Sequence, residues 1–178
     1  MAKANRALKD SVFTNLFGER QAFLELYSAL LGVELPPDVH AEDVTLDQVL
    51  FLDRVNDLAY LVGDTVVILV EHQSTVNPNM PLRFLMYVAG VYEKLIDDDK
   101  QYSHKLLRIP KPVFIVLYNG DEPYPEQVTL RLSDAFMEAG QLLPAELTEL
   151  ASLELEVKVY NVNVDKNREL VRRSRVFA

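Results

Sequence analysis

The sequence predicts an α/β domain in which helices flank a central mixed sheet. The first reason is the order of hydrophobic patterns along the chain, which predicts an α-β-β-β-α-β core. The second is size, because 178 residues suit one domain with a substantial buried core. The third is composition, since 49% hydrophobic and 25% charged residues are ordinary for a globular protein. We therefore expect one domain over residues 1–178, with its core in about residues 8–125 and a C-terminal extension over 126–178.

The first predicted helix covers Asp10 to Leu31, where apolar residues recur at helical spacing. Gly18 is an expected break, and Gly32 is the expected C-terminal stop because glycine tolerates the left-handed conformation found there. Three strands are predicted next, and Gly63-Asp64 supplies a tight turn between the last two, so these two form an antiparallel hairpin. The predicted strands are Val44 to Phe51, Asp57 to Val62 and Val66 to Glu71.

The second predicted helix covers about Pro81 to Ile96. One of its faces is expected to pack on the sheet, and a different stripe carries residues that are available for chemistry. The expected buried residues are Leu82, Leu85, Met86, Ala89 and Ile96, and the second stripe holds Arg83, Tyr87, Gly90 and Lys94.

The rest of the chain adds a buried strand and three weaker elements. Pro112 to Tyr118 is apolar throughout and is followed by the turn Asn119-Gly120-Asp121. We also expect a short helix over Ser133 to Ala139, a half-exposed strand over Leu153 to Val164 and a helical tail over Asp165 to Ala178. The tail has little apolar surface, so we expect either that the natural protein continues beyond its last residue or that this end docks on a second copy in a homo-oligomer.

The stretch VVILVEHQST, Val66 to Thr75, places polar side chains at the end of the most apolar strand. Because strand side chains alternate, Glu71 and Gln73 project to the same side. In the predicted hairpin Asp57 lies directly opposite Glu71, at about 4.5–5.5 Å. Two carboxylates at that spacing repel, and a cation between them relieves the repulsion. The alternative is that Asp57 is a turn residue and Glu71 a surface charge.

Composition excludes several kinds of site. The chain has no Cys, which excludes disulfides, thiolate catalysis and Cys-ligated zinc, and oxygen ligands favour Mg²⁺ or Mn²⁺. Its three His (His40, His72 and His104) do not pair at metal-ligand spacing. No apolar run is long enough for a membrane span and the N-terminus lacks a signal-peptide core, so we expect a cytoplasmic protein without membrane contact. The net charge of −9 argues against a general polyanion-binding surface, though not against a local one.

Four stretches, in this order, resemble one nuclease superfamily. They are the helix KDSVFTNLFGE, the strand end VEHQ, the helix MPLRFLMYVAGVYEKL and the strand with turn PVFIVLYNGDEPYP, which cover about residues 8 to 125. With Asp57-Leu58 and Glu71-x-Gln73 in an α-β-β-β-α-β order, they resemble the PD-(D/E)XK nuclease superfamily. More narrowly, they are similar to its branch of recombination-promoting nucleases and predicted transposases. The resemblance implies a restriction-endonuclease-like fold, DNA as the partner and Mg²⁺ as the cofactor, for which Mn²⁺ substitutes.

The resemblance also implies roles for the polar residues of the hairpin. Asp57 and Glu71 match the two metal-binding acids, and the backbone carbonyl of His72 is the implied third ligand. Gln73 stands at the position of the superfamily's lysine, which departs from the general pattern. A lysine positions the attacking water and stabilises charge on the phosphate, whereas an amide orients water without supplying charge.

Two cations on the following helix are candidates for the missing positive charge. Arg83 and Lys94 both follow Gln73 on the second predicted helix, and either one replaces the lysine if it reaches the site. Tyr87 on the same stripe is expected to hydrogen-bond Gln73 or a phosphate. The alternatives are that the two cations are solvated surface residues and that Tyr87 only flanks the core.

An acid on the first helix is a further implied member of the site. Asp10, Glu19 and Glu25 are the candidates. Asp10 has an alternative role as a helix N-cap, because an aspartate there satisfies free backbone amides.

Basic residues cluster in two places, and clusters of this kind contact phosphates in nucleic acids. The alternative for both is a solvated face on an acidic protein. The first cluster is Lys100, Lys105, Arg108 and Lys111, and the second is Lys166, Arg168, Arg172, Arg173 and Arg175.

Taken together, these patterns predict a Mg²⁺-dependent DNA endonuclease associated with transposition or recombination. Asp57 and Glu71 would hold the metal, which activates a water and neutralises the scissile phosphate. Two alternatives stay open. One is an interaction module that keeps the fold and has lost the chemistry, and the other is a metal-dependent hydrolase of a smaller phosphoester.

Overall fold

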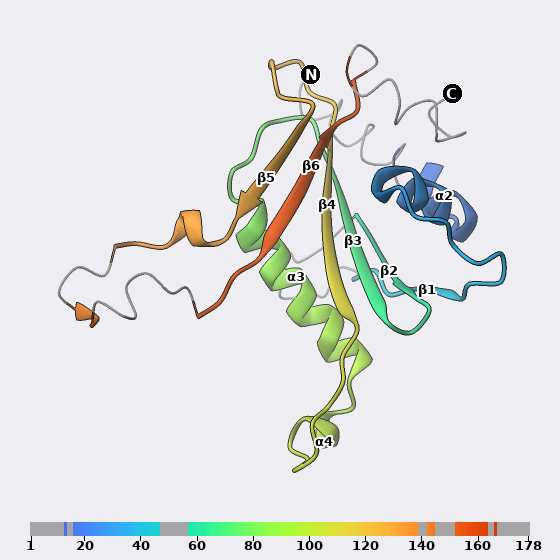
Figure 1. Ribbon diagram of the computed structural model, residues 1–178, viewed down its shortest axis with the longest axis vertical. Coiled ribbons are helices and arrows are strands. Elements are labelled where there is room, and N and C mark those ends of the chain that lie inside the picture. The colour runs from blue at the N-terminus through green and yellow to red at the C-terminus, as the bar shows by residue number, and fades with distance from the viewer. Residues whose placement is uncertain are drawn as a thin grey trace.

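The computed structural model describes residues 13, 16–46, 57–138, 142–144, 152–163 and 166. Six strands form one mixed sheet with helices on its two faces, which confirms the predicted α/β class and is consistent with a restriction-endonuclease-like fold (Figure 1). The strands are β1 (Ala41–Asp43), β2 (Leu58–Val62), β3 (Val66–Gln73), β4 (Lys111–Tyr118), β5 (Gln127–Arg131) and β6 (Glu156–Asn161). No helix of the described residues is long and apolar enough to cross a membrane.

The strand order β1-β2-β3-β4-β6-β5 places parallel pairs in the middle of the sheet and antiparallel pairs at both edges. Neighbours β1, β2 and β3 pair antiparallel, β4 pairs parallel with both β3 and β6, and β5 pairs antiparallel with β6. The parallel pairing brings the C-terminal ends of β3 and β4 to the same end of the sheet. Strand β6, inside the predicted strand Leu153 to Val164, lies between β4 and the edge strand β5, which the hydrophobic pattern did not predict.

The hairpin of β2 and β3 has the predicted turn and register. Gly63 and Asp64 both adopt φ of +55°, the left-handed conformation that a two-residue hairpin turn requires. Leu58 pairs with Val70 and Val62 with Val66. Continuing this register by one residue sets Asp57 opposite Glu71, as predicted.

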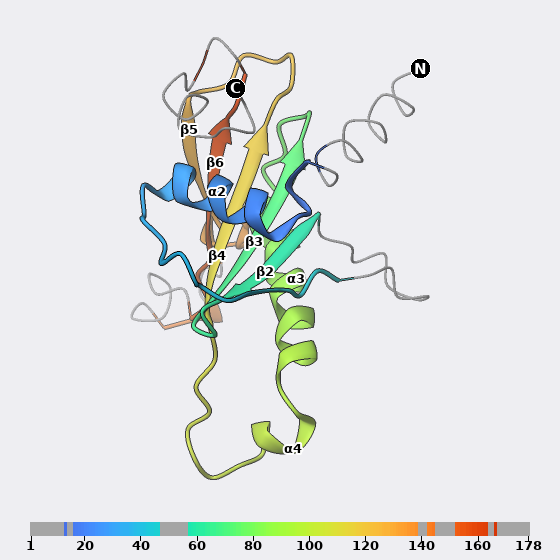
Figure 2. The same ribbon diagram turned by 90° about the vertical axis from the view of Figure 1, so that its right-hand side faces the viewer.

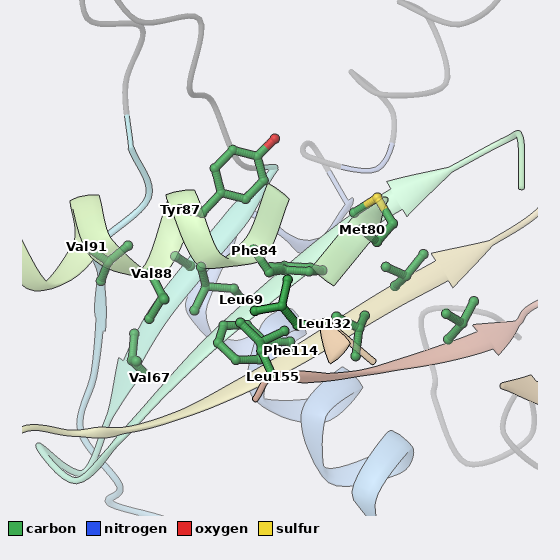
Figure 3. Close-up of a cluster of buried hydrophobic side chains, with 14 of the residues drawn as sticks. Val67, Leu69, Met80, Phe84, Tyr87, Val88, Val91, Phe114, Leu132 and Leu155 are labelled. Atoms are coloured by element: carbon green, nitrogen blue, oxygen red, sulfur yellow. The ribbon is translucent and has the colours of Figure 1, made fainter. Parts of the chain in front are cut away.

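Two helices cover opposite faces of the sheet (Figures 1 and 2). Helix α2 (Arg20–Leu31) packs Phe23 and Leu26 against the face that carries Ile68 and Val70. It starts after a bend at the predicted break Gly18, and Gly32 caps its end with φ of +65°. Helix α3 (Met80–Leu95) covers the other face, the one to which Val67 and Leu69 point (Figure 3).

The buried face of α3 is not the one that we expected. Phe84, Tyr87, Val88 and Val91 pack on the sheet (Figure 3), while Leu82 and Met86 of the expected stripe are 45% and 41% exposed. The helix is apolar on nearly all sides, so helical spacing alone supports two competing stripes. The buried stripe is the one with the larger apolar surface, because Phe84 and Tyr87 each remove an aromatic ring from water.

The first strand does not lie in its predicted range, Val44 to Phe51. It covers Ala41–Asp43, and residues 44–46 of the predicted strand have no strand conformation, while residues 47–51 lie outside the described residues. The Thr45 hydroxyl accepts a hydrogen bond from the amide of Ala59 at 2.9 Å, and the Thr45 amide donates to a carboxylate oxygen of Asp43 at 2.9 Å. The Val44 amide still donates to the Ala59 carbonyl at 2.8 Å, and after it these side-chain bonds take the place of backbone pairing, which accounts for the end of β1.

The remaining predictions have mixed outcomes. The short helix is a single 3₁₀ turn, η1 (Ser133–Ala135), in place of Ser133 to Ala139, and a four-residue helix α4 (Asp98–Gln101) follows α3. The helical tail lies outside the described residues apart from Lys166, as do Asp10 and the start of the first predicted helix.

Gly120 is required by the close packing of the turn after β4, and we expect Gly120→Ala to destabilise the protein. A Cβ atom there would overlap the carbonyl oxygen of Ser74 and lie 2.5 Å from the hydroxyl oxygen of Tyr118. Overpacking of this kind costs about 1–3 kcal/mol, which lowers the melting temperature by roughly 3–10 °C in thermal denaturation. Gly90→Ala is the control, because its Cβ would meet only the flexible end of Leu46. Equal melting temperatures for the two variants would contradict the prediction.

Candidate functional site

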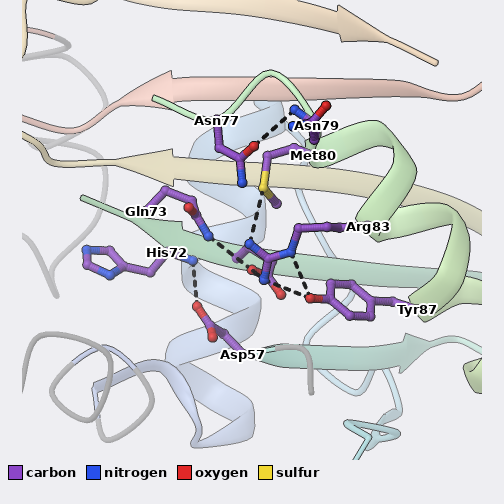
Figure 4. Close-up of polar contacts among 9 residues, drawn as sticks. Asp57, His72, Gln73, Asn77, Asn79, Met80, Arg83 and Tyr87 are labelled. Carbon is purple, nitrogen blue, oxygen red and sulfur yellow. Dashed lines mark hydrogen bonds and ion pairs between the residues drawn. The ribbon is translucent and has the colours of Figure 1, made fainter. Parts of the chain in front are cut away.

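A polar cavity of about 260 Å³ lies where β3 ends and α3 begins. Gln73 reaches it from β3, Asp57 from the residue before β2, and Arg83 from the first turn of α3 (Figure 4). Glu71, on the same strand as Gln73, lines it as well. These side chains meet because the face of β3 that carries Glu71 is the one that α3 covers. The lining residues are Asp57, Glu71, His72, Gln73, Ser74, Thr75, Asn77 and Arg83.

Glu71 is the most buried polar group of this cavity, with 1% of its surface exposed. Its Oε2 accepts hydrogen bonds from Arg83 Nη2 at 2.9 Å and from Gln73 Nε2 at 3.2 Å. Its Oε1 is buried and has no hydrogen-bond partner among the described residues. Burial, followed by the charge of Asp57, raises the pKa of Glu71 to about 8, although the Arg83 guanidinium lowers it. A buried carboxyl with one unpartnered oxygen is the unusual feature of this site.

Asp57 is held in place by the strand beside it. Its Oδ2 accepts a hydrogen bond from the backbone amide of His72 at 2.7 Å. The ring of His72 points away from the cavity (Figure 4). It stacks on Phe13, with ring centroids 5.3 Å apart. His72 therefore turns its imidazole away from the cavity, and its backbone amide holds Asp57.

Arg83 is fixed from two sides. Its Nε and Nη2 donate to the Tyr87 hydroxyl at 3.0 and 2.7 Å, and Nη2 also reaches Glu71. Its Nη1 lies 3.7 Å from the sulfur of Met80. The guanidinium side chain is 38% exposed, so it retains contact with solvent and with any ligand in the cavity. Burial raises the pKa of Tyr87, which keeps its hydroxyl protonated at neutral pH.

The structure brings Arg83, and not Lys94, to the predicted site. Lys94 is exposed and its ammonium lies 3.4 Å from the Thr45 carbonyl. Tyr87 hydrogen-bonds Arg83, whereas we had expected a bond to Gln73 or a phosphate. Gln73 donates to Glu71, so the amide supports the carboxylate directly.

The described acids of the first helix do not line this cavity. Glu19 is exposed at the N-terminal cap of α2, and Glu25 lines a separate groove between α2 and the loop that follows it. Helix α2 covers the sheet face opposite Glu71, which accounts for their position. The described residues contain no group of three or more His, Cys, Asp or Glu side chains placed to hold a metal ion.

The loop before α3 contributes residues that we did not predict. Asn77 lines the cavity, and its Oδ1 accepts the backbone amide of Asn79 at 3.0 Å (Figure 4). That bond fixes the orientation of the side-chain amide, so its NH₂ group is available as a donor. The sequence signal was present in Asn77-Pro78-Asn79, a turn that joins the strand carrying Glu71 to the helix carrying Arg83.

Comparison with known proteins identifies the family of this chain. No curated protein and no solved structure matches the chain. A family model described as "Putative transposase, YhgA-like" matches residues 9–178. Because this match covers nearly the whole chain, including the cavity and both helices that flank the sheet, the protein belongs to the YhgA-like putative transposase family.

Proposed function

We propose that this protein is a metal-dependent DNA endonuclease of the PD-(D/E)XK type. Its family membership indicates a role associated with transposition or recombination, and with it DNA as the partner. The observation that carries the nuclease proposal is the buried Glu71, whose Oε1 has no partner among the described residues and which lies in register with Asp57. Paired acids with an unsatisfied oxygen are the arrangement that a divalent cation completes.

The residues of the cavity suit a hard divalent cation. Asp57, Glu71 and the His72 carbonyl offer only oxygen, the donor that Mg²⁺ and Mn²⁺ prefer. Burial and, after it, the charge of Asp57 raise the pKa of Glu71, and a cation would remove the repulsion between the two carboxylates. When bound, the metal would lower the pKa of a coordinated water and neutralise charge on the phosphate.

The chain's own residues would then act on the substrate and on the water. Arg83 lies 2.9 Å from Glu71 and is partly exposed, so it supplies the positive charge that Gln73 lacks. Gln73 lines the cavity with its amide nitrogen on Glu71, which leaves its carbonyl oxygen to orient the water. The Asn77 NH₂ group is a donor for a phosphate oxygen, and the first turn of α3 favours negative charge at the same place.

Cation binding tests the proposal most directly. We expect isothermal titration with Mn²⁺ to show saturable binding to the wild type, and Asp57→Asn to weaken it at least about tenfold by removing a ligand charge. Asp64→Asn is the matched control, because Asp64 is exposed in the turn at the other end of the same hairpin and asparagine tolerates its positive φ.

Each other outcome has a definite meaning. Absence of Mn²⁺ binding to the wild type would refute the proposal and favour an interaction module with the same fold. Equal loss in Asp57→Asn and Asp64→Asn would show that the ion binds elsewhere. Metal-dependent hydrolysis of a small phosphodiester, without cleavage of DNA, would favour the smaller substrate class.

A further inference from the structure

The connection between α3 and β4 is an exposed projection of the fold. Fifteen residues separate Leu95 from Lys111, whereas helix-to-strand connections in α/β proteins usually take about 2–6 residues. The segment contains α4 and extends beyond the end of the sheet, on the far side from the cavity (Figures 1 and 2). We call residues 97–111 the arm.

The arm carries four cations and three aspartates, a net charge of +1 (4 − 3), and three of its cations have no partner among the described residues. Lys105, Arg108 and Lys111 are exposed and have no side-chain hydrogen bond or ion pair among the described residues. The other described cations are engaged, apart from Lys166. Each of these engaged cations contacts a carbonyl, hydroxyl or carboxylate oxygen; they are Arg20, Arg83, Lys94, Lys100, Arg131 and Lys158. On a chain with a net charge of −9, the unpaired cations therefore concentrate in one segment.

The same segment exposes apolar side chains, one of them aromatic. Tyr102 is 81% exposed, Leu106 82% and Ile109 49%. An exposed aromatic ring among unpaired cations is the combination by which proteins bind nucleic acid, since cations contact phosphates and rings pack on bases or sugars.

We propose that the arm is a DNA-binding element of this protein. Lys105, Arg108 and Lys111 contact backbone phosphates, and Tyr102 packs against the nucleotide. The inference rests on the proposed function only in taking DNA as the ligand, because the binding itself needs neither the cavity nor a metal.

The position of the arm also sets the minimum length of duplex that can reach both the arm and the cavity. Arg83 lies at the start of α3 and the arm follows its end, and a 16-residue helix is about 24 Å long. That length corresponds to roughly seven base pairs of duplex at about 3.4 Å each. A duplex cut in the cavity must therefore extend at least that far on one side to reach the arm.

Fluorescence anisotropy with a labelled 20-base-pair duplex in EDTA tests the arm without the metal. We expect the triple variant Lys105→Ala, Arg108→Ala, Lys111→Ala to bind at least about tenfold more weakly. The negative slope of log affinity against log salt concentration should become shallower by roughly 2.7, about 0.9 for each lost phosphate contact. Tyr102→Ala should weaken binding and Tyr102→Phe should not. The control triple Lys94→Ala, Arg131→Ala, Lys158→Ala removes cations that are already engaged, also lowers the net charge by three, from −9 to −12, and should bind as the wild type does.

Four results would overturn the proposal that the arm binds DNA. Two of them are a wild type that does not bind DNA and an arm triple variant that binds DNA as tightly as the wild type. The others are an equal loss of DNA affinity in both triple variants, and arm-dependent binding to phosphatidylserine vesicles without binding to DNA. The nuclease proposal fails separately. If the arm binds DNA but Mn²⁺ does not bind to the protein, the nuclease proposal is refuted and the proposal about the arm is retained. If DNA is cut in a metal-dependent reaction and the arm triple variant binds DNA as the wild type does, only the proposal about the arm is refuted.

Discussion

Replacing Glu71 with glutamine is expected to abolish metal-dependent DNA cleavage and, at the same time, to stabilise the metal-free protein above neutral pH. Glutamine keeps the shape of the side chain and removes its charge. A metal's stabilisation of the transition state amounts to several kcal/mol, and each 1.4 kcal/mol is tenfold in rate, so we expect a loss of at least about 10³-fold. Nicking of supercoiled plasmid in Mg²⁺ or Mn²⁺ measures this loss.

The stability effect follows from the proton that Glu71 holds. Its pKa is about 8 in the folded protein and near 4.5 in the unfolded chain, because burial and the charge of Asp57 disfavour the ionised form. Between these two values the folded state keeps a proton that the unfolded state has released. The free energy of unfolding of the wild type therefore falls as pH rises from about 4.5 to 8, and the protein is more stable below this window than above it.

Glutamine at position 71 has no proton to lose, so its stability should not fall across this window. The amide oxygen keeps the place of Oε2 opposite the Arg83 and Gln73 donors, and the NH₂ group takes the place of Oε1 beside Asp57. The charge of Arg83 remains solvated when its carboxylate partner is lost, because its side chain is 38% exposed to water. At pH 8 in EDTA we expect the variant to melt roughly 5–10 °C above the wild type, from a difference on the order of a few kcal/mol.

Thermal melts at pH 5 and pH 8 check the sign. The advantage of Glu71→Gln should be small at pH 5 and large at pH 8, and saturating Mn²⁺ should stabilise only the wild type. Glu93→Gln, at an exposed position of α3, is the control and should follow the wild type at both pH values. A variant whose advantage is the same at pH 5 and pH 8 would contradict the raised pKa.

The features of the site that could be predicted are those fixed over a short stretch of chain. Gly63-Asp64 permits only a two-residue turn, and such a turn determines the register of the strands on either side. That is why the opposition of Asp57 and Glu71 followed from counting residues. Alternation along β3 likewise placed Glu71 and Gln73 on one face.

The features that could not be predicted depend on contacts between distant segments. Helix α3 is apolar on most sides, so only the presence of the sheet selects Phe84 over Leu82 for burial. The end of β1 depends on the Thr45 hydroxyl meeting Ala59, fourteen residues away in sequence. Arg83 and Lys94 lie on one stripe of α3 but at different positions along the helix axis. Arg83, in the first turn, therefore reaches Glu71, whereas Lys94, in the last turn, does not.

Loss of the Arg83 guanidinium is expected to lower the cleavage rate by roughly 10²–10³, the usual cost of removing one well-placed donor to the transition state. Arg83 is the cation that contacts Glu71, and Tyr87 holds it there with two hydrogen bonds. Lys94→Ala removes a cation from the same helix outside the cavity and is the control. Single-turnover cleavage at saturating metal measures both variants. Equal rates for Arg83→Ala and the wild type would show that the guanidinium has no part in the reaction.

Gln73→Lys should restore much of that loss. The amide of Gln73 donates to Glu71 Oε2 and accepts nothing from Arg83 or Tyr87, so an ammonium can take over its contact. In the Arg83→Ala background the new lysine supplies the missing positive charge, and we expect it to raise the rate at least about tenfold. In the wild-type background Arg83 already occupies the neighbouring contact on the same oxygen, so the gain should be smaller. A gain of the same size in both backgrounds would mean that the two positions act independently. The coupling energy of this double-mutant cycle therefore decides whether Arg83 does the work that a lysine performs in the PD-(D/E)XK nucleases that the sequence resembles.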